Sequence, residues 1–225
     1  MNLVPARADS LPAKLRGFGP LGLLAIAVIV LVQTILPPLG ALLVLVWAWL
    51  SCTPWKEIGY ASPKSWFQSL ALGVAFGISL KFAMKAIVMP LFGADPINRA
   101  FHYLAGNRAA LPEAIYLMIV VAGFGEETFF RGYGFERLRK LMGSSRASIV
   151  ATVVLTSVWF GSAHYAVQGA SGVEQATIVG LIFGSIYAAT QRIWLLVAAH
   201  AAFDLTALVM IYLDLETRVA HLVFK

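Results

Sequence analysis

Apolar stretches long enough to cross a membrane, separated by short charged or turn-rich segments, constrain this sequence more than any other feature. Hydrophobic residues make up 60% of the chain and charged residues only 12%, whereas roughly a quarter of a soluble domain is charged. We therefore predict an all-α fold: a polytopic transmembrane helical bundle of about seven to eight spans, forming a single integral membrane domain over residues 1–225. The stretches cover about 18–36, 38–52, 66–92, 112–141, 147–164, 174–190 and 193–213.

Two local patterns predict how these helices are joined and packed. The first two stretches meet at Pro37-Pro38, and a helix cannot run through proline without losing a hydrogen bond. We therefore expect a tight helical hairpin there. Gly73 and Gly77 lie one turn apart on the third stretch, a spacing that allows another helix to approach closely.

Lysine and arginine are distributed unevenly between the segments that connect the stretches. With seven spans, one side of the membrane holds ten of them and the other side four. Basic residues favour the cytoplasmic side, so we expect a cytoplasmic N-terminus. The net charge of +6 also occurs in nucleic-acid-binding proteins, but its placement between apolar stretches indicates the lipid bilayer as partner and no nucleic acid. The ten are Arg7, Lys14, Arg16, Lys56, Lys64, Arg137, Arg139, Lys140, Arg146 and Arg192; the four are Arg99, Arg108, Arg218 and Lys225.

Three further residues suit purely structural roles. Cys52 is the only cysteine, which excludes an internal disulfide and a cysteine-based metal site, and we interpret it as a free buried thiol. Lys81 and Lys85 lie toward the far end of a long apolar stretch. Their side chains are long enough to snorkel to the membrane interface.

The segment GEETFFRGYGFERLRK, residues 125–140, places two glutamates and an arginine at the end of an apolar run. On a helix, Glu127 and Arg131 are one turn apart and can pair, whereas Glu126 points about 100° away and has no partner on the same helix. An unpaired carboxylate inside a membrane suits a general base or acid. The alternative is a buried ion-pair cluster that only fixes helix packing.

Two later stretches also carry ionisable groups. His164 follows Phe160 by one turn at the end of an apolar helix, which by itself fits an interfacial histidine. His200 and Asp204 share one face of the last stretch. At 1.5 Å per residue, Glu126 and His200 lie about 13 Å and about 12 Å from one interface, whereas His164 lies nearer the opposite one. Three helices that carry inward-facing ionisable groups predict a polar site inside the bundle.

In this order, Glu126-Glu127-xxx-Arg131, Phe160-xxx-His164 and His200-xxx-Asp204 resemble the CAAX protease and bacteriocin-processing family. That family is also called the Abi or type II CAAX prenyl endopeptidase family. The resemblance covers roughly residues 110–212 and indicates that this part is the catalytic core. The N-terminal stretches show no diagnostic motif.

The resemblance implies an intramembrane endopeptidase that hydrolyses a peptide bond of a membrane-associated, prenylated or secreted peptide with a glutamate-activated water. By this resemblance Glu126 is the general base, Glu127 a supporting acid, and Arg131 the residue that holds the carboxylates. His164 helps to position or activate the water. The partner is thus a peptide or protein substrate in or at the membrane, and no cofactor is implied.

The resemblance also implies that His200 and the residue at 204 stabilise the oxyanion of the tetrahedral intermediate. The best-known members have asparagine at the last position, whereas this sequence has Asp204. An ionised aspartate has no proton to donate. Asp204 is therefore either protonated or a residue that orients His200.

Two alternatives belong to other functional classes. A glutamate and two histidines can bind zinc, which would make the protein a zinc-dependent membrane peptidase, although the sequence has no His-Glu-x-x-His segment. Buried carboxylates and histidines also suit a proton-coupled transporter or a bacteriocin-immunity scaffold. The chain lacks the internal repeat that many transporters show.

Overall fold

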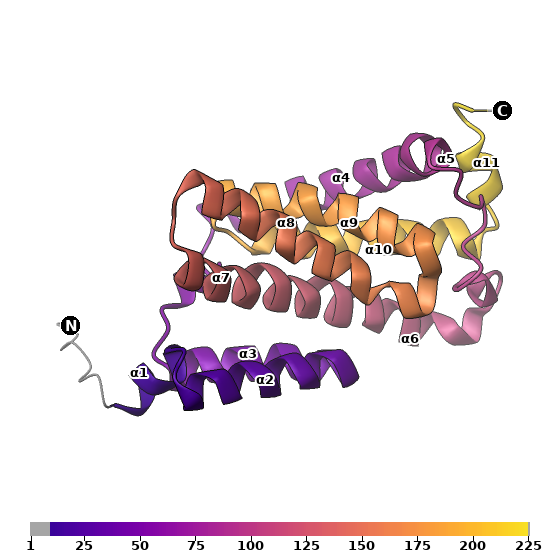
Figure 1. The fold of residues 1–225 in the computed structure, drawn as a ribbon. Helices are drawn as coiled ribbons and strands as arrows, with labels where there is room; N and C mark the ends of the chain where they lie inside the picture. The colour runs from indigo at the N-terminus through magenta and orange to yellow at the C-terminus, as the bar shows by residue number, and fades with distance from the viewer. Residues whose placement is uncertain (1–9, 225) are drawn as a thin grey trace.

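The computed structural model describes residues 10–224, which form helices and connecting segments without a β-strand. The prediction of an all-α polytopic bundle is confirmed (Figure 1). The α-helices are α1 Leu11–Arg16, α2 Pro20–Ile35, α3 Pro37–Leu50, α4 Trp66–Ala83, α5 Met89–Leu91, α6 Leu111–Tyr116, α7 Phe135–Met142, α8 Arg146–Ala163, α9 Tyr165–Thr190, α10 Trp194–Tyr212 and α11 Glu216–Ala220. π-helical segments Met84–Val88 and Leu117–Gly134 connect α4 to α5 and α6 to α7, and short 3₁₀ turns cover Trp55–Ile58, His102–Leu104 and Arg108–Ala110.

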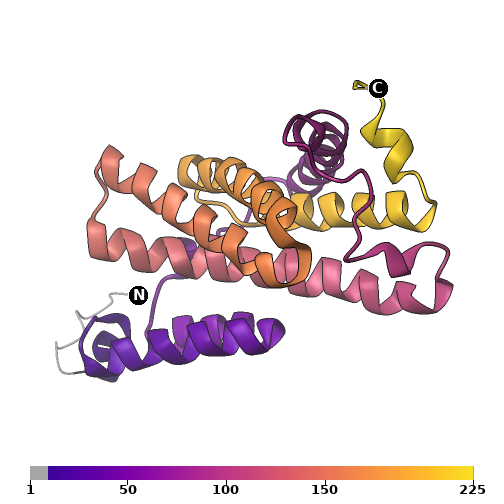
Figure 2. The same cartoon turned by 45° about the vertical axis from the view of Figure 1, so that its right-hand side comes forward.

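Within the described residues, five helical stretches are long and apolar enough to cross a membrane: Trp66–Leu91, Arg108–Met142, Arg146–Ala163, Tyr165–Thr190 and Trp194–Tyr212. The first two predicted spans are shorter. α2 has 16 residues and α3 has 14, or about 24 Å and about 21 Å of helix, against a hydrocarbon core of about 30 Å. Figures 1 and 2 show this pair beside the α7 half of the long central helix, ending before its α6 half.

The hairpin between α2 and α3 forms where the sequence predicts it. Leu36 has a non-helical backbone conformation, and Pro37 and Pro38 begin α3. Gly40 then packs directly on the preceding helix, since a Cβ atom there would lie 2.3 Å from the side-chain oxygen of Gln33. α2 and α3 run in opposite directions, so the chain leaves the hairpin at the end of the bundle where it entered. α1 and α11 therefore lie at opposite ends of the bundle, whether or not α2 and α3 cross the membrane fully (Figure 1).

α4 and α10 pack backbone to backbone, as the two glycines predict. A Cβ atom at Gly73 would lie 2.5 Å from the carbonyl oxygen of Leu195, and one at Gly77 would lie 2.1 Å from that of Ala199. No other residue fits at these positions without moving α10. The close approach therefore fixes where α10 places the residue after Ala199, which is His200.

The central helix, Arg108–Met142, contains an 18-residue π-helical segment over Leu117–Gly134. Hydrogen bonds in a π-helix run to the fifth residue, and such segments are often found at functional sites. A Cβ atom at Gly123 would lie 2.9 Å from the Cβ of Ala201. The glycine therefore lets this wide helix lie against α10 beside the two glutamates that follow.

Three of the structural interpretations are wrong. Lys81 and Lys85 do not snorkel but are buried, with 6% and 9% of their surface exposed. Each ammonium has a partner inside the protein, and for Lys85 this is a carboxylate oxygen of Glu216 at 3.0 Å. The free thiol of Cys52 is exposed rather than buried, because Cys52 lies in the turn after α3 with φ of 52°.

Candidate functional site

Glu127 forms the centre of a hydrogen-bonded cluster. Its side chain is fully buried, and its Oε1 accepts hydrogen bonds from Arg131 Nη1 at 2.9 Å and from His200 Nδ1 at 2.7 Å. The Arg131 guanidinium lies 4.6 Å from the ring centre of Phe160 and 5.6 Å from that of Phe183, a cation–π arrangement. The arginine is therefore held by one carboxylate and two aromatic rings.

This cluster fixes the orientation of the His200 ring. An ionised carboxylate only accepts hydrogen bonds, so Nδ1 is the donor to Glu127. Nε2 then faces the other way, 3.7 Å from Glu126 Oε2 and 3.6 Å from Asp204 Oδ2. Both distances exceed a normal hydrogen bond. Nε2 is therefore available to a molecule that lies between the two carboxylates.

Glu126, His164, His200 and Asp204 all line one cavity of about 250 Å³, here called the site cavity. The Oε2 atom of Glu126 is buried and has no hydrogen-bond partner among residues 10–224. About 22% of the Glu126 side chain is exposed. A cavity of this size with polar walls has room for several water molecules. Adjacent glutamates thus have opposite surroundings, one bonded within the protein and one open to a cavity.

His164 reaches this cavity although the depth calculation places it near the opposite interface. It caps the C-terminal end of α8, and its Nδ1 donates to the carbonyl oxygen of Phe160 at 2.8 Å when that nitrogen carries the proton. α8 has 18 residues and runs obliquely across the much longer central helix (Figures 1 and 2). The end of α8 therefore meets the central helix near Glu126 rather than at its tip.

Arg131 contacts Glu127 but not Glu126, since among residues 10–224 its ion pair is with Glu127 alone. The resemblance implied an arginine that holds both carboxylates. Only Glu127 lies beside Arg131, because the two glutamates point in different directions from the same helix. Glu126 has instead the imidazole of His200 beside it, with Nε2 at 3.7 Å from Oε2.

Lys81 and Gln175, for which we predict no site role from the sequence, also line the site cavity. Lys81 Nζ donates to Gln175 Oε1 at 3.2 Å. The signal for Lys81 was present, since it is an ionisable residue inside an apolar stretch. For Gln175 there was none, because an amide on a long helix is common in any bundle.

A connecting segment supports the cluster from the α1 end of the bundle. The hydroxyl groups of Tyr60 and Thr128 lie 2.6 Å apart, and Thr128 is the residue after Glu127. Burial raises the pKa of Tyr60 to about 12, although its bond to Thr128 acts in the opposite direction. The phenol therefore stays neutral and ties the segment before α4 to the central helix.

Comparison with known families matches residues 109–206 to the family described as type II CAAX prenyl endopeptidase Rce1-like. No curated protein and no solved structure matches the chain. The matched region starts at the beginning of the central helix and includes Glu126, Glu127, Arg131 and His164 as well as His200 and Asp204. Residues 109–206 of this integral membrane protein are therefore similar to the type II CAAX prenyl endopeptidase Rce1-like family, the family that its three motifs resemble.

Proposed function

We propose that the protein is an intramembrane endopeptidase in which Glu126 activates a water molecule for attack on a peptide bond. The observation that carries this proposal is the surroundings of Glu126. Its carboxylate faces the site cavity without a hydrogen-bond partner among residues 10–224. The substrate is a peptide or protein in or at the membrane, in keeping with the family.

In the first step, Glu126 Oε2 takes a proton from water as the water oxygen adds to the substrate carbonyl carbon. The same proton is then transferred to the departing amine, and Glu126 returns to its ionised form. When Nδ1 of His164 is bonded to the Phe160 carbonyl, its Nε2 carries a lone pair. That lone pair accepts the second proton of the water in a hydrogen bond and sets the direction of attack.

The developing oxyanion needs a donor, and His200 Nε2 is placed for this role. Nε2 carries a hydrogen while Nδ1 donates to Glu127 only when the imidazole is protonated. Three carboxylates lie within 3.7 Å of the ring nitrogens and supply the counter-charge in that form. Glu127 and Arg131 thus act by holding His200. Asp204 orients the same ring from the cavity side or, when protonated, donates alongside it.

The walls of the site cavity support this chemistry. Apolar side chains such as Leu117, Val121 and Phe203 line it next to the ionisable groups. Hydrogen bonds and charges act more strongly where bulk water is excluded. We also propose that the α1 end faces the cytoplasm, because nine of the ten basic residues counted for that side lie in α1, in connecting segments at that end, or in α7 and α8 beside them. Arg7 and Lys225, which the count includes, lie outside the described residues.

The proposal is tested by comparing membrane-protein termini in cells that carry the wild type, Glu126→Gln or Glu113→Gln at matched expression. Glu113 lies on the same central helix and is exposed, so it controls for the loss of one carboxylate. We expect new termini with the wild type and with Glu113→Gln, and their loss with Glu126→Gln. Equal terminal profiles in all three cell lines would contradict the proposal.

Zinc-dependent catalysis is an alternative that the sequence leaves open. Within residues 10–224, no group of three or more His, Cys, Asp and Glu side chains is arranged to hold a metal ion. Metal analysis of the purified protein, with cleavage measured before and after chelation, tests this alternative. A cellular effect that survives Glu126→Gln would instead favour the non-catalytic scaffold or transporter.

A further inference from the structure

Lys81 differs from other buried cations of the bundle in its lack of an acidic partner. Only 6% of its surface is exposed, and no carboxylate oxygen of residues 10–224 lies within 4.0 Å of its ammonium. Taking an ammonium out of water is costly unless an anion compensates for the lost solvation. Other buried cations meet this requirement in the ion pairs Arg131–Glu127, Lys85–Glu216 and Arg137–Glu136.

The contacts of Lys81 are with neutral groups. Among residues 10–224, its Nζ makes one hydrogen bond, to Gln175 Oε1 at 3.2 Å, and it lies 4.6 Å from the ring centre of Phe203. An ammonium carries three protons, so two remain for another acceptor. Lys81 lines the site cavity together with Glu126.

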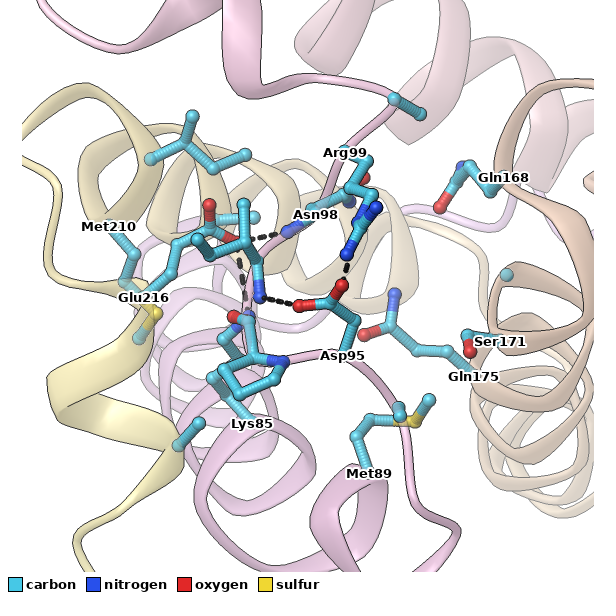
Figure 3. Close-up of a pocket in the computed structure, with 18 of the residues that line it drawn as sticks. Lys85, Met89, Asp95, Asn98, Arg99, Gln168, Ser171, Gln175, Met210 and Glu216 are labelled. Carbon is cyan, nitrogen blue, oxygen red and sulfur yellow. Dashed lines mark hydrogen bonds and ion pairs between the residues drawn. The ribbon is translucent and has the colours of Figure 1, made fainter.

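Lys81 also lines a second cavity, of about 300 Å³, toward the α11 end of the bundle (Figure 3). The two cavities share the polar side chains of Lys81, Asn98, Gln168 and Gln175 and the apolar ones of Ala207 and Ile211. Figure 3 shows that the other cations of this second cavity are already engaged. Arg99 pairs with Asp95 at 2.7 Å, and Lys85 pairs with Glu216 at 3.0 Å. Lys81 is thus the cation that remains available at the junction of the two cavities.

We propose that Lys81 is an anion subsite that binds a carboxylate of the peptide substrate close to the bond that is cleaved. This inference rests on the proposed function and adds a specificity-determining residue to it. Phe203, over which Nζ lies, follows His200 by three residues on α10, or about 4.5 Å along the helix axis. An extended peptide advances about 3.3 Å per residue. The carboxylate therefore belongs to a residue within a few positions of the cleaved bond.

Two sources supply this carboxylate: the C-terminus of a peptide that is cleaved near its end, or an acidic side chain near the cleaved bond.

A different role for Lys81 is charge balance, since Glu126 and Asp204 line the same cavity and Lys85 and Glu216 lie beside the second one. Charge balance would affect every substrate equally. Carboxylate recognition affects only substrates that carry the carboxylate.

The test uses a synthetic peptide that spans a cleavage site mapped through its dependence on Glu126. The peptide is made with a free C-terminus, with a C-terminal amide, and with its acidic side chains replaced by amides. Full-length wild type, Lys81→Met and Lys81→Arg are compared by kcat/KM for each form. Replacing a buried charge with an apolar side chain of similar length is often tolerated, and Lys81→Arg keeps the charge. Lys85→Met combined with Glu216→Gln, which removes a paired lysine, is the control.

We expect the wild type to lose about tenfold or more in kcat/KM, mainly through KM, when the recognised carboxylate becomes an amide. Lys81→Met should cleave the parent peptide as poorly as the amide form, while Lys81→Arg and the control should keep the discrimination. The form that loses activity identifies the source of the carboxylate. Equal cleavage of all forms by the wild type, or an equal loss on all forms in Lys81→Met, would overturn the inference. Failure of the proposed function is recognised separately, because then no form is cleaved in a Glu126-dependent way.

Discussion

Glu126 and Glu127 are the same residue type at adjacent positions, yet the fold treats them in opposite ways. Glu127 is fully buried: its Oε1 accepts hydrogen bonds from Arg131 and His200, and its Oε2 is buried without a partner among residues 10–224. The Oε2 of Glu126 has no such bond among residues 10–224 and faces the site cavity. A carboxylate whose bonds are made within the protein holds other groups in place. One whose bonds are left open can exchange a proton with a bound molecule.

A substitution at Glu126 tests the contrast between the two glutamates most directly. We expect Glu126→Gln to lower kcat/KM by about 10²–10⁴, the range for losing a general base. The thermal unfolding temperature should stay close to that of the wild type, because the substitution breaks no hydrogen bond within residues 10–224. Kinetics and thermal unfolding of the purified protein in detergent measure both quantities. A clear drop in unfolding temperature would mean that Glu126 is structural after all.

Glu127→Gln should instead destabilise the protein and inactivate it together. The substitution leaves the buried Arg131 without its anion, and breaking a buried ion pair in this way typically costs about 3–5 kcal/mol. The paired substitution Glu127→Gln/Arg131→Met removes both charges, so we expect it to recover much of the stability. Its activity should stay low, because Nδ1 of His200 no longer donates to a carboxylate. Full activity in the double variant would contradict the assigned role.

The sequence predicts the helices and the ionisable residues of this site well, for physical reasons that act locally. Apolar run length sets where helices lie, and an ionisable residue such as Glu126 or His200 is conspicuous inside such a run. The i,i+4 spacing of Glu127 and Arg131 is enough to predict their contact. The roles of these residues in catalysis remain predictions.

What the sequence does not predict depends on how helices meet. The convergence of His164 with Glu126 follows from the oblique course of α8, which no local pattern records. The burial of Lys81 depends on α9 and α10, which supply Gln175 and Phe203 as its neighbours. The short lengths of α2 and α3 are partly visible in the sequence, since Pro37 and Pro38 leave only short apolar runs on either side.

A third substitution tests whether the comparison depends on the position of α10. Gly77→Ala places a methyl group where the carbonyl of Ala199 lies, 2.1 Å away. Overpacking of this kind typically costs about 1–3 kcal/mol, and it should push His200 away from Glu127. We expect a lower unfolding temperature and reduced kcat/KM. Ala75→Val, at an exposed position of the same helix, is the control and should change neither. Unchanged activity in Gly77→Ala would show that the His200 position tolerates a shift of α10.

The exposed pair Asp95–Arg99 sharpens the comparison, because it has the same i,i+4 spacing as Glu127–Arg131 but lies at the surface. A hydrogen bond from the Ile97 amide and the contact with Arg99 lower the pKa of Asp95 below its usual 3.8. Because the pKa of Asp95 is lower in the folded protein than in the unfolded chain, ionised Asp95 contributes stability above the unfolded-state pKa. This contribution is lost as the pH falls through the folded-state pKa. Between pH 5 and pH 8 the contribution of Asp95 to stability should therefore be constant. Because exposed ion pairs are screened by solvent, we expect Asp95→Asn to leave the unfolding temperature and kcat/KM unchanged in that pH range. Hydrogen exchange should increase only in residues 93–110. A drop in stability comparable to that of Glu127→Gln would show that the spacing of the pair, rather than its burial, determines its contribution.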